Sequence, residues 1–404
     1  MLFKGFFSYL CNLNEFLMPK TIVNIVTEDN PVPAYLFIKE MYESGDRLLF
    51  ISAKDTEEDL DALAEQFDVP SNLIDEVVLK HDMDEITYEK ICRTIRARLV
   101  PGLRYCVNLA GGTRYMALAV QQVFEKFHAD YYYLDVEKNV IVKSVFDDSL
   151  YDDDDHFFPV KYRMSVAEYL RIHSVKHDIK NLKDFEPIRS RKEAERFLTI
   201  FTSGQLTNAD YDVLEILRNS YRDEKRIDIG NVERGGDKKE PPIPNLSAFL
   251  DSICFFPIKK GVLLKPELEY LTGGWFEEYV YYQVIENLQP DEALIGPHIG
   301  REGVSLNNEL DVVCIKNNKL FVIECKSGVQ GKRMFNEIVY KVCALREMML
   351  GISCYSYIFS LKKDHKEDLK RIAANMDIQF VDGEMINSQK ELVQVIQDMR
   401  KLAK

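Results

Sequence analysis

The segment Glu309–Lys326, E-L-D-V-V-C-I-K-N-N-K-L-F-V-I-E-C-K, predicts two strands joined by a turn. Glu309–Ile315 and Lys319–Cys325 are rich in β-branched and other apolar residues, which is typical of buried strands. The intervening Lys316–Asn318 is polar and predicts the turn. The segment therefore indicates a β-hairpin, and its strands are the centre of a C-terminal α/β domain.

The hairpin carries charged side chains that can approach one another. Asp311 and Glu324 fall on the two paired strands and can lie at neighbouring positions. Alternation along the second strand places Glu324 and Lys326 on one face, with Cys325 on the other. Such charges are costly to bury among apolar residues without a partner, and Mg²⁺ or Mn²⁺ prefers oxygen ligands of this kind. A plain ion pair between Glu324 and Lys326 is the alternative interpretation.

Helices and further strands extend this domain on both sides. The predicted elements are helices over Trp275–Leu288, Lys332–Leu350 and Gln389–Leu402, and strands over Tyr355–Leu361 and Ile378–Val381. The first helix carries Glu277, a further carboxylate that precedes the hairpin. From Lys326 to Arg346 the chain has a local charge of +4, from Lys326, Lys332, Arg333, Lys341 and Arg346 against Glu337. This stretch predicts a phosphate-facing patch.

The N-terminal part alternates strands with helices, which is typical of a parallel, doubly wound α/β domain. The predicted strands are Thr21–Val26, Arg47–Ser52, Ile74–Leu79, Tyr105–Leu109, Ala129–Asp135 and Val140–Ser144, and the predicted helices are Ala34–Ser44, Thr56–Phe67, Tyr88–Leu99 and Thr113–Phe127.

A glycine loop, Asn108–Arg114 (N-L-A-G-G-T-R), runs from the end of a strand into a helix. Glycines let the backbone approach a ligand, and a helix N-terminus offers N–H groups to an anion. Thr27–Asn30 and Ser52–Lys54 follow two other strands, so they are expected at the same edge of the sheet. A tight strand-to-helix turn is the alternative, and the loop matches neither the NAD nor the NTP motif. The candidate ligand-binding residues are Thr27, Glu28, Asn30, Ser52, Lys54, Asn108, Ala110, Gly111, Gly112, Thr113 and Arg114.

Composition limits the class of protein. The 404 residues predict two to three domains, and 46% hydrophobic with 29% charged residues is ordinary for a globular chain. The net charge of −14 excludes a protein that coats nucleic acid over its whole surface, so any contact needs a local basic patch. The eight cysteines form no C-x-x-C pair, which argues against a zinc ribbon and for the reducing cytoplasm. No apolar run is long enough to predict a membrane span.

The predicted domains are an N-terminal extension (residues 1–19), a first α/β domain (20–148), a linker with a winged-helix-like segment (149–261) and a second α/β domain (262–404). Asp147–Asp155 is acidic and predicts a solvated linker, with a cation site as the alternative. Thr207–Asn219 begins with a helix-cap signature. Its helix could contact DNA, or it could serve as a spacer or dimer contact.

The pattern W-x-E … E-L-D-V … F-V-I-E-C-K over Gly273–Lys404 resembles the PD-(D/E)xK, or restriction-endonuclease-like, nuclease core. In place of the family's proline before the aspartate, Glu309-Leu310 stands here. The resemblance implies a divalent cation, Mn²⁺ or Mg²⁺, held by Asp311, Glu324, Glu277 and the backbone carbonyl of Cys325. The implied catalytic residues are Glu277, Asp311, Glu324, Lys326 and Lys341; Lys326 would assist the attacking water, and the alternatives for Lys341 are phosphate positioning or a solvated side chain.

The N-terminal pattern, a first strand ending V-T-E-D-N and the loop N-L-A-G-G-T-R-Y-M, resembles the CARF domain over Lys20–Ser144. This is the CRISPR-associated Rossmann-like sensor of cyclic oligoadenylates. Ala110 and Arg114 stand where the family usually has threonine and lysine. The combination with a nuclease core resembles the ancillary effector nucleases of type III CRISPR systems, and it implies a homodimer whose two loops form one ligand pocket.

The sequence therefore predicts a metal-dependent endonuclease of antiviral defence that cleaves DNA or RNA when a cyclic oligoadenylate, cyclic tetra-adenylate in the first instance, binds the CARF dimer. Two alternatives are a CARF transcription regulator whose winged helix binds DNA, and a ring nuclease that degrades the cyclic oligoadenylate itself.

Overall fold

The structure is a computed structural model of the 404-residue chain. It describes residues 19–27, 30–53, 57–79, 87–144, 156–221, 224–235, 241–300, 308–328, 339, 342–343, 354–361 and 366–403. Residues 1–18 of the predicted extension lie outside this range, as does the acidic segment Asp147–Asp155. Most of the predicted helix over Lys332–Leu350, with its basic residues, also lies outside it. The candidate site residues Glu28, Lys54 and Lys341 do so as well.

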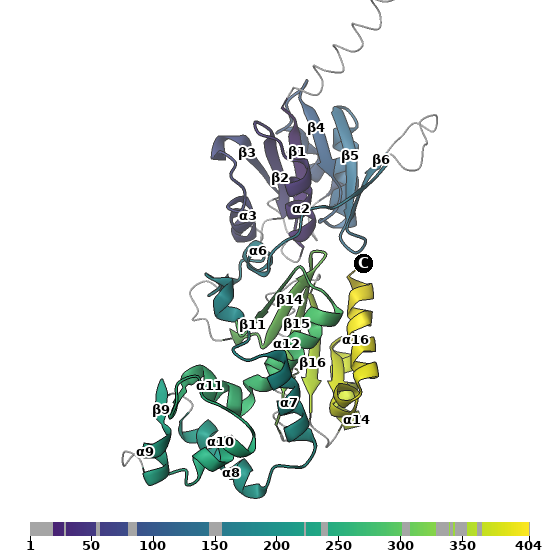
Figure 1. Cartoon of the computed structure of the whole chain (residues 1–404). Helices are drawn as coiled ribbons and strands as arrows, with labels where there is room; N and C mark the ends of the chain where they lie inside the picture. The colour runs from purple at the N-terminus through teal and green to yellow at the C-terminus, as the bar shows by residue number, and fades with distance from the viewer. Residues whose placement is uncertain are drawn as a thin grey trace, which may run out of the picture.

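The N-terminal domain is the predicted doubly wound α/β structure (Figure 1). Its sheet has the order β3-β2-β1-β4-β5-β6-β7, with the first five strands of that order parallel and the last two antiparallel. The strands are β1 (Thr21–Val26), β2 (Arg47–Ala53), β3 (Ile74–Leu79), β4 (Arg104–Asn108), β5 (His128–Asp135), β6 (Val140–Ser144) and β7 (Phe157–Pro159). All six residues of β1 are buried, as expected for a central strand covered on both faces.

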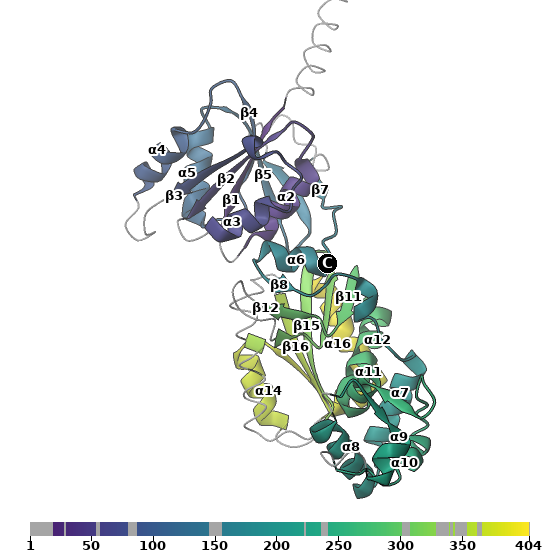
Figure 2. The ribbon, with the colours of Figure 1, turned by 90° about the vertical axis from the view of Figure 1, so that its left-hand side faces the viewer.

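Helices cover both faces of this sheet (Figure 2). The helices α2 (Val32–Met41) and α3 (Glu57–Ala64) pack on one face, and α4 (Tyr88–Arg96) and α5 (Arg114–Phe124) pack on the other. The strand order reverses between β1 and β4, which are neighbours in the sheet: β2 and β3 lie on one side of this pair, and β5 lies on the other. In an open α/β sheet such a switch point, at the carboxyl ends of the strands, is where a ligand crevice forms.

The C-terminal domain is built on a second sheet, of order β11-β14-β15-β16-β17. Its strands are β11 (Glu292–Ile295), β14 (Val312–Lys316), β15 (Lys319–Lys326), β16 (Cys354–Ser360) and β17 (Gln379–Asp382). The helices α12 (Trp275–Asn287) and α16 (Gln389–Leu402) pack on one face, and α14 (Lys366–Asn375) lies on the other (Figure 2). The predicted hairpin is confirmed as β14–β15, and its turn residues Asn317 and Asn318 have the positive φ angles that a tight hairpin turn needs.

The first strand of that hairpin is shorter than predicted. Residues Asn308–Glu309 form a separate strand, β13, which pairs with β12 (His298–Gly300) beside β8 (Lys176–His177). Between β13 and β14 the carbonyls of Leu310 and Asp311 both accept from the backbone N–H of Gly296. This shared contact bends the chain at Asp311 and turns it from one sheet into the other.

The middle segment is helical and packs on the C-terminal domain. It contains α7 (Arg191–Thr202), α8 (Asn208–Ser220), α9 (Ile229–Arg234), α10 (Leu246–Ser252) and α11 (Lys265–Glu269), with the antiparallel pair β9 (Arg226–Asp228) and β10 (Val262–Leu264). The predicted cap is confirmed: Thr207 and Asp210 form a capping box at the start of α8. On α7, Phe201 stacks on Trp275 with ring centroids 4.7 Å apart, so the segment and α12 share one core.

The two α/β domains meet around α6 (Val166–Ile172), which lies between the sheets in both views (Figures 1 and 2). Buried side chains of both domains form one apolar cluster there, including Leu36 on α2, Leu170 on α6 and Val313 on β14. None of the described helices is long and apolar enough to cross a membrane.

At the end of α6, His173 stacks on Tyr169 with ring centroids 4.5 Å apart and donates from Nδ1 to the carbonyl of Tyr169 at 2.9 Å. Burial lowers the pKa of His173 to about 4, because a charged imidazole would lose its hydration there. The unfolded chain takes up this proton near pH 6.5, so folding loses stability as the pH falls from that value toward 4.

We predict that His173→Gln makes the protein less acid-sensitive. Between pH 7 and pH 5 the wild type should lose about 2 kcal/mol of unfolding free energy through this group, and the variant should not. Denaturant unfolding at both pH values measures the difference, with His128→Gln, at an exposed position of β5, as the matched control. Equal acid sensitivity of the wild type and His173→Gln would contradict the assignment.

Candidate functional site

At the C-terminal end of β15, a lysine lies between two buried carboxylates. Lys326 Nζ is 3.0 Å from Asp311 Oδ2 and 2.7 Å from Glu324 Oε1. Because Val312 pairs with Ile323, the preceding Asp311 falls beside Glu324, and strand alternation brings Lys326 to the same face. The backbone N–H of Cys325 also donates to Asp311 Oδ2, at 2.7 Å. The structure therefore brings together three of the predicted catalytic residues.

Burial and mutual charge determine the protonation of this cluster. Burial and then the Glu324 carboxylate raise the pKa of Asp311 to about 6, against the opposing effect of Lys326. Burial alone would lower the pKa of Lys326, but the two carboxylates hold it above its usual range. The lysine is thus a permanent cation, and the carboxylates are stable as a pair only with positive charge nearby.

Glu277 is a third carboxyl group, at the wall of a cavity. It lies in the first turn of α12 and is half-buried. Burial raises its pKa well above the usual range, and Asp311, Glu309 and Glu324 raise it further. The site can therefore hold a proton on Glu277, or a cation that several carboxylates share.

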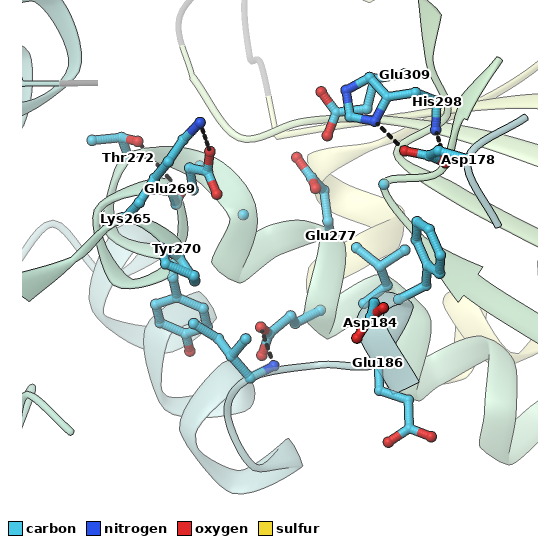
Figure 3. A pocket seen from close by; sticks show the side chains of 18 of the residues that line it. Asp178, Asp184, Glu186, Lys265, Glu269, Tyr270, Thr272, Glu277, His298 and Glu309 are labelled. Carbon is cyan, nitrogen blue, oxygen red and sulfur yellow. Dashed lines mark hydrogen bonds and ion pairs between the residues drawn. The ribbon is translucent and has the colours of Figure 1, made fainter. Parts of the chain in front are cut away.

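The cavity in front of Glu277 has a volume of about 1020 Å³ (Figure 3). Its wall includes Gly273 and Gly274 before α12, Glu309 on β13 and His298 on β12. Asp178 accepts from His298 Nδ1 at 3.2 Å and from the His298 backbone at 2.9 Å, which orients the ring. Sequence analysis did not predict His298, Asp178 or Glu309 as site residues. The sequence carried a signal only for Glu309, which lies two residues before the predicted metal ligand Asp311.

The donor atoms suit a hard divalent cation. Asp311 and Glu324 offer carboxylate oxygens, and Glu277 is a third carboxyl group that interacts electrostatically with both. Within the described ranges no three His, Cys, Asp or Glu side chains are arranged as a metal cluster, and the ammonium of Lys326 takes the place between the two carboxylates. The chemistry of the residues fits such an ion, and Asp311, Glu324, Glu277 and the Cys325 carbonyl as its ligands all stay predictions.

A second cavity, of about 420 Å³, lies at the carboxyl ends of the N-terminal strands. Asn30 after β1 and Ala110 and Gly111 after β4 line it, as predicted for a crevice at the switch point. Thr27 Oγ1 donates to the carbonyl of Gly111 at 2.7 Å and so ties the two loops together.

The two glycines of the loop are required by packing. Gly111 has a φ of +96°, and a Cβ there would lie 2.6 Å from the carbonyl oxygen of Ile25. At Gly112 a Cβ would lie 2.3 Å from Cγ2 of Ile25. The loop therefore rests directly on β1, and a substitution at either glycine would disturb the fold as well as any ligand.

Two predicted ligand-binding residues are fully buried and hold the loops in place. Asn108 Nδ2 donates to Asn24 Oδ1 at 3.0 Å, and Asn108 Oδ1 accepts from the N–H of Ala110 at 3.1 Å. Ser52 Oγ donates to Glu76 Oε1 at 3.1 Å. These contacts give Asn108 and Ser52 a positioning role within the sheet.

Thr113 and Arg114, by contrast, are exposed at the start of α5. Thr113 caps the helix by accepting from the N–H of Met116 at 3.2 Å. The positive charge of Arg114 thus stands beside a helix N-terminus, where an anion is favoured.

Two family models match the chain in separate parts. The model of the Card1 CARF domain matches residues 21–169, and that of the Card1-like endonuclease domain matches residues 265–399. The chain is thus an endonuclease that carries a CARF domain, as the sequence predicted. Within that class, the chain joins a CARF domain and an endonuclease domain that are both of the Card1 kind.

No curated protein matches the sequence. Among solved structures, protein VC1899 from Vibrio cholerae is similar over 95% of this chain and 99% of its own, with 17% identity and a TM-score of 0.69. Can2 from Sulfobacillus thermosulfidooxidans, solved in complex with cyclic tetra-adenylate, is similar over the same shares, with 19% identity and a TM-score of 0.65. At these identities the similarity establishes the shared fold.

Proposed function

We propose that this chain is a metal-dependent endonuclease that a cyclic oligoadenylate activates through the CARF domain. The observation that carries the proposal is the ammonium of Lys326 between two buried carboxylates, Asp311 and Glu324, in a Card1-like endonuclease domain. A purely structural hairpin would not need three ionised groups in its core, because apolar residues there are at least as stable.

Nucleases with a PD-(D/E)xK-like core generally use divalent metals, and we propose Mn²⁺ or Mg²⁺ here. When bound, such an ion polarises the scissile phosphate and lowers the pKa of an attacking water. Asp311 and Glu324 would hold it. Lys326 keeps its proton, so its charge can orient the water or stabilise the phosphorane charge, and Glu277 can carry a proton at the cavity wall.

The activator is proposed to bind at the loop Gly111–Arg114. The exposed Arg114 and the α5 N-terminus are suited to phosphate, and the structural neighbour Can2 was solved with cyclic tetra-adenylate. A ligand with two-fold symmetry would be bound by two copies of this loop in a homodimer. We also propose that the protein is cytoplasmic, since none of the seven cysteines that the structure describes forms a disulfide.

The proposal is tested by incubating the protein with Mn²⁺, plasmid DNA and RNA, with and without cyclic tetra-adenylate, and by following both the nucleic acid and the cyclic nucleotide. Activator-dependent cleavage of nucleic acid supports the proposal. Nucleic acid left intact would contradict it: DNA binding without cleavage would favour a transcription regulator, and loss of the cyclic nucleotide alone would favour a ring nuclease.

We predict that Asp311→Asn and Glu324→Gln each lower the cleavage rate by on the order of 100-fold or more. Each removes a ligand charge worth several kcal/mol in the transition state while preserving side-chain shape. The measurement is a single-turnover rate at saturating Mn²⁺ and activator, with activator affinity and thermal unfolding measured in parallel. Asp398→Asn, on the exposed face of α16, is the matched control, and wild-type cleavage by either site variant would disprove the assignment.

We further predict that Arg114→Ala raises the activator concentration needed for half-maximal cleavage by about 10-fold, because a charge-assisted hydrogen bond to phosphate is lost. Background cleavage without activator should not change. Dose–response curves of the wild type, Arg114→Ala and the exposed control Arg93→Ala on α4 measure the shift. Overlap of all three curves would mean that Arg114 does not contact the activator.

A further inference from the structure

The cavity beside the CARF loop has a wall that belongs to the endonuclease domain. Gly111 and Asn30 line it from the CARF side, and Lys319 and Tyr355 line it from the other domain. Lys319 is the first residue of β15, and Tyr355 lies at the start of the neighbouring β16. The N-terminal ends of two endonuclease strands therefore face the carboxyl ends of the CARF strands across one cavity.

Lys319 is a buried cation without a carboxylate partner in the described part of the chain. The residue is 2% exposed, and its Nζ donates to the carbonyl of Glu137 at 2.6 Å and to the carbonyl of Leu402. Two carboxylates also belong to the cavity wall, but Asp135 is paired with Lys138 at 3.4 Å and Glu137 is exposed. Burial accordingly lowers the pKa of Lys319, although Glu137 and Asp135 oppose that shift.

An ammonium in this position favours an anionic ligand. Two carbonyl dipoles satisfy only two of its three N–H donors, and a buried charge is costly until a counter-charge approaches it. Across the same cavity, Gly111 leads into the N-terminus of α5, which also attracts anions. The Lys319 wall is thus suited to a phosphate group, and Gly111 of the opposite wall lies two residues before the α5 N-cap, Thr113.

The strand that begins at Lys319 ends in the carboxylate cluster, since β15 runs from Lys319 to Lys326. The preceding residue, Asn318, is completely buried and joins the domains: its Nδ2 donates to Asn139 Oδ1 at 2.9 Å, and its Oδ1 accepts from the N–H of Met164 at 2.8 Å. A ligand that contacts Lys319 therefore acts on the same strand that carries Glu324 and Lys326.

We infer that Lys319, a residue of the endonuclease domain, binds a phosphodiester group of the activator in this cavity. The inference rests on the proposed function. In addition to that function, we infer that the endonuclease domain contacts the activator directly. Part of the binding free energy is then gained only when the domains are arranged so that β15 lies against the occupied cavity.

The test compares Lys319→Met, which removes the charge but keeps the stem, with Lys319→Arg, which keeps the charge. Asn318→Ala is the matched control, because it removes the adjacent interdomain hydrogen bonds and leaves the cation in place. The affinity for cyclic tetra-adenylate and for cyclic hexa-adenylate is measured by calorimetry at low and high salt, and cleavage is measured against activator concentration. Thermal unfolding checks that each variant is folded.

Lys319→Met should weaken binding of the activating ring by about 10- to 100-fold at low salt, with a smaller loss at high salt, because the lost contact is ionic. Lys319→Arg should restore most of the affinity, and Asn318→Ala should keep the salt dependence of the wild type. Unchanged affinity in folded Lys319→Met, or an equal loss at both salt concentrations, would overturn this inference and leave the proposed function standing. If neither ring binds or activates the wild type, the proposed function fails together with it.

Discussion

The endonuclease site depends on two short ion pairs, which Lys326 makes with Asp311 and Glu324. Two carboxylates at neighbouring strand positions repel each other, and burial strengthens that repulsion. The ammonium of Lys326 makes the arrangement stable, and Glu277 adds a carboxyl group whose pKa burial raises well above its usual range. The domain thus carries a carboxylate pair that is already ordered and buried, so the proposed divalent cation would bind to it with little rearrangement.

Elements whose signals are local could be predicted from the sequence with almost their final bounds. The ranges of β1, β3, β6 and α16 agree with the prediction. The run of β1 is typical of a buried parallel strand, and α16 repeats its apolar positions as an amphipathic helix does. The bend at Asp311 could not be predicted, because it depends on Gly296, a residue of another segment. Glu309 and His298 were missed for the same reason: they share a cavity with Glu277 only after three segments have packed together.

The ligand side shows how one motif can serve both packing and binding. The glycines that marked the loop are needed because the loop lies against Ile25, and Asn108 is used to hold it there. What remains for a ligand is the exposed start of α5 and a cavity whose far wall includes Lys319. In the sequence, Lys319 is only the first residue of a predicted strand. Its burial could not be predicted, because the carbonyls that accept its hydrogen bonds belong to Glu137 and Leu402, which are remote in the chain.

The central claim is that Asp311 and Glu324 hold a divalent cation while the charge of Lys326 acts in the chemical step. The most direct measurement is a calorimetric Mn²⁺ titration of Lys326→Met and the wild type in the presence of cyclic tetra-adenylate, paired with single-turnover cleavage, with Lys401→Met on the exposed face of α16 as the control. The account predicts that Lys326→Met binds Mn²⁺ at least as tightly as the wild type, while its cleavage rate falls on the order of 100-fold. Loss of Mn²⁺ binding in a folded Lys326→Met variant, or cleavage at the wild-type rate, would contradict it.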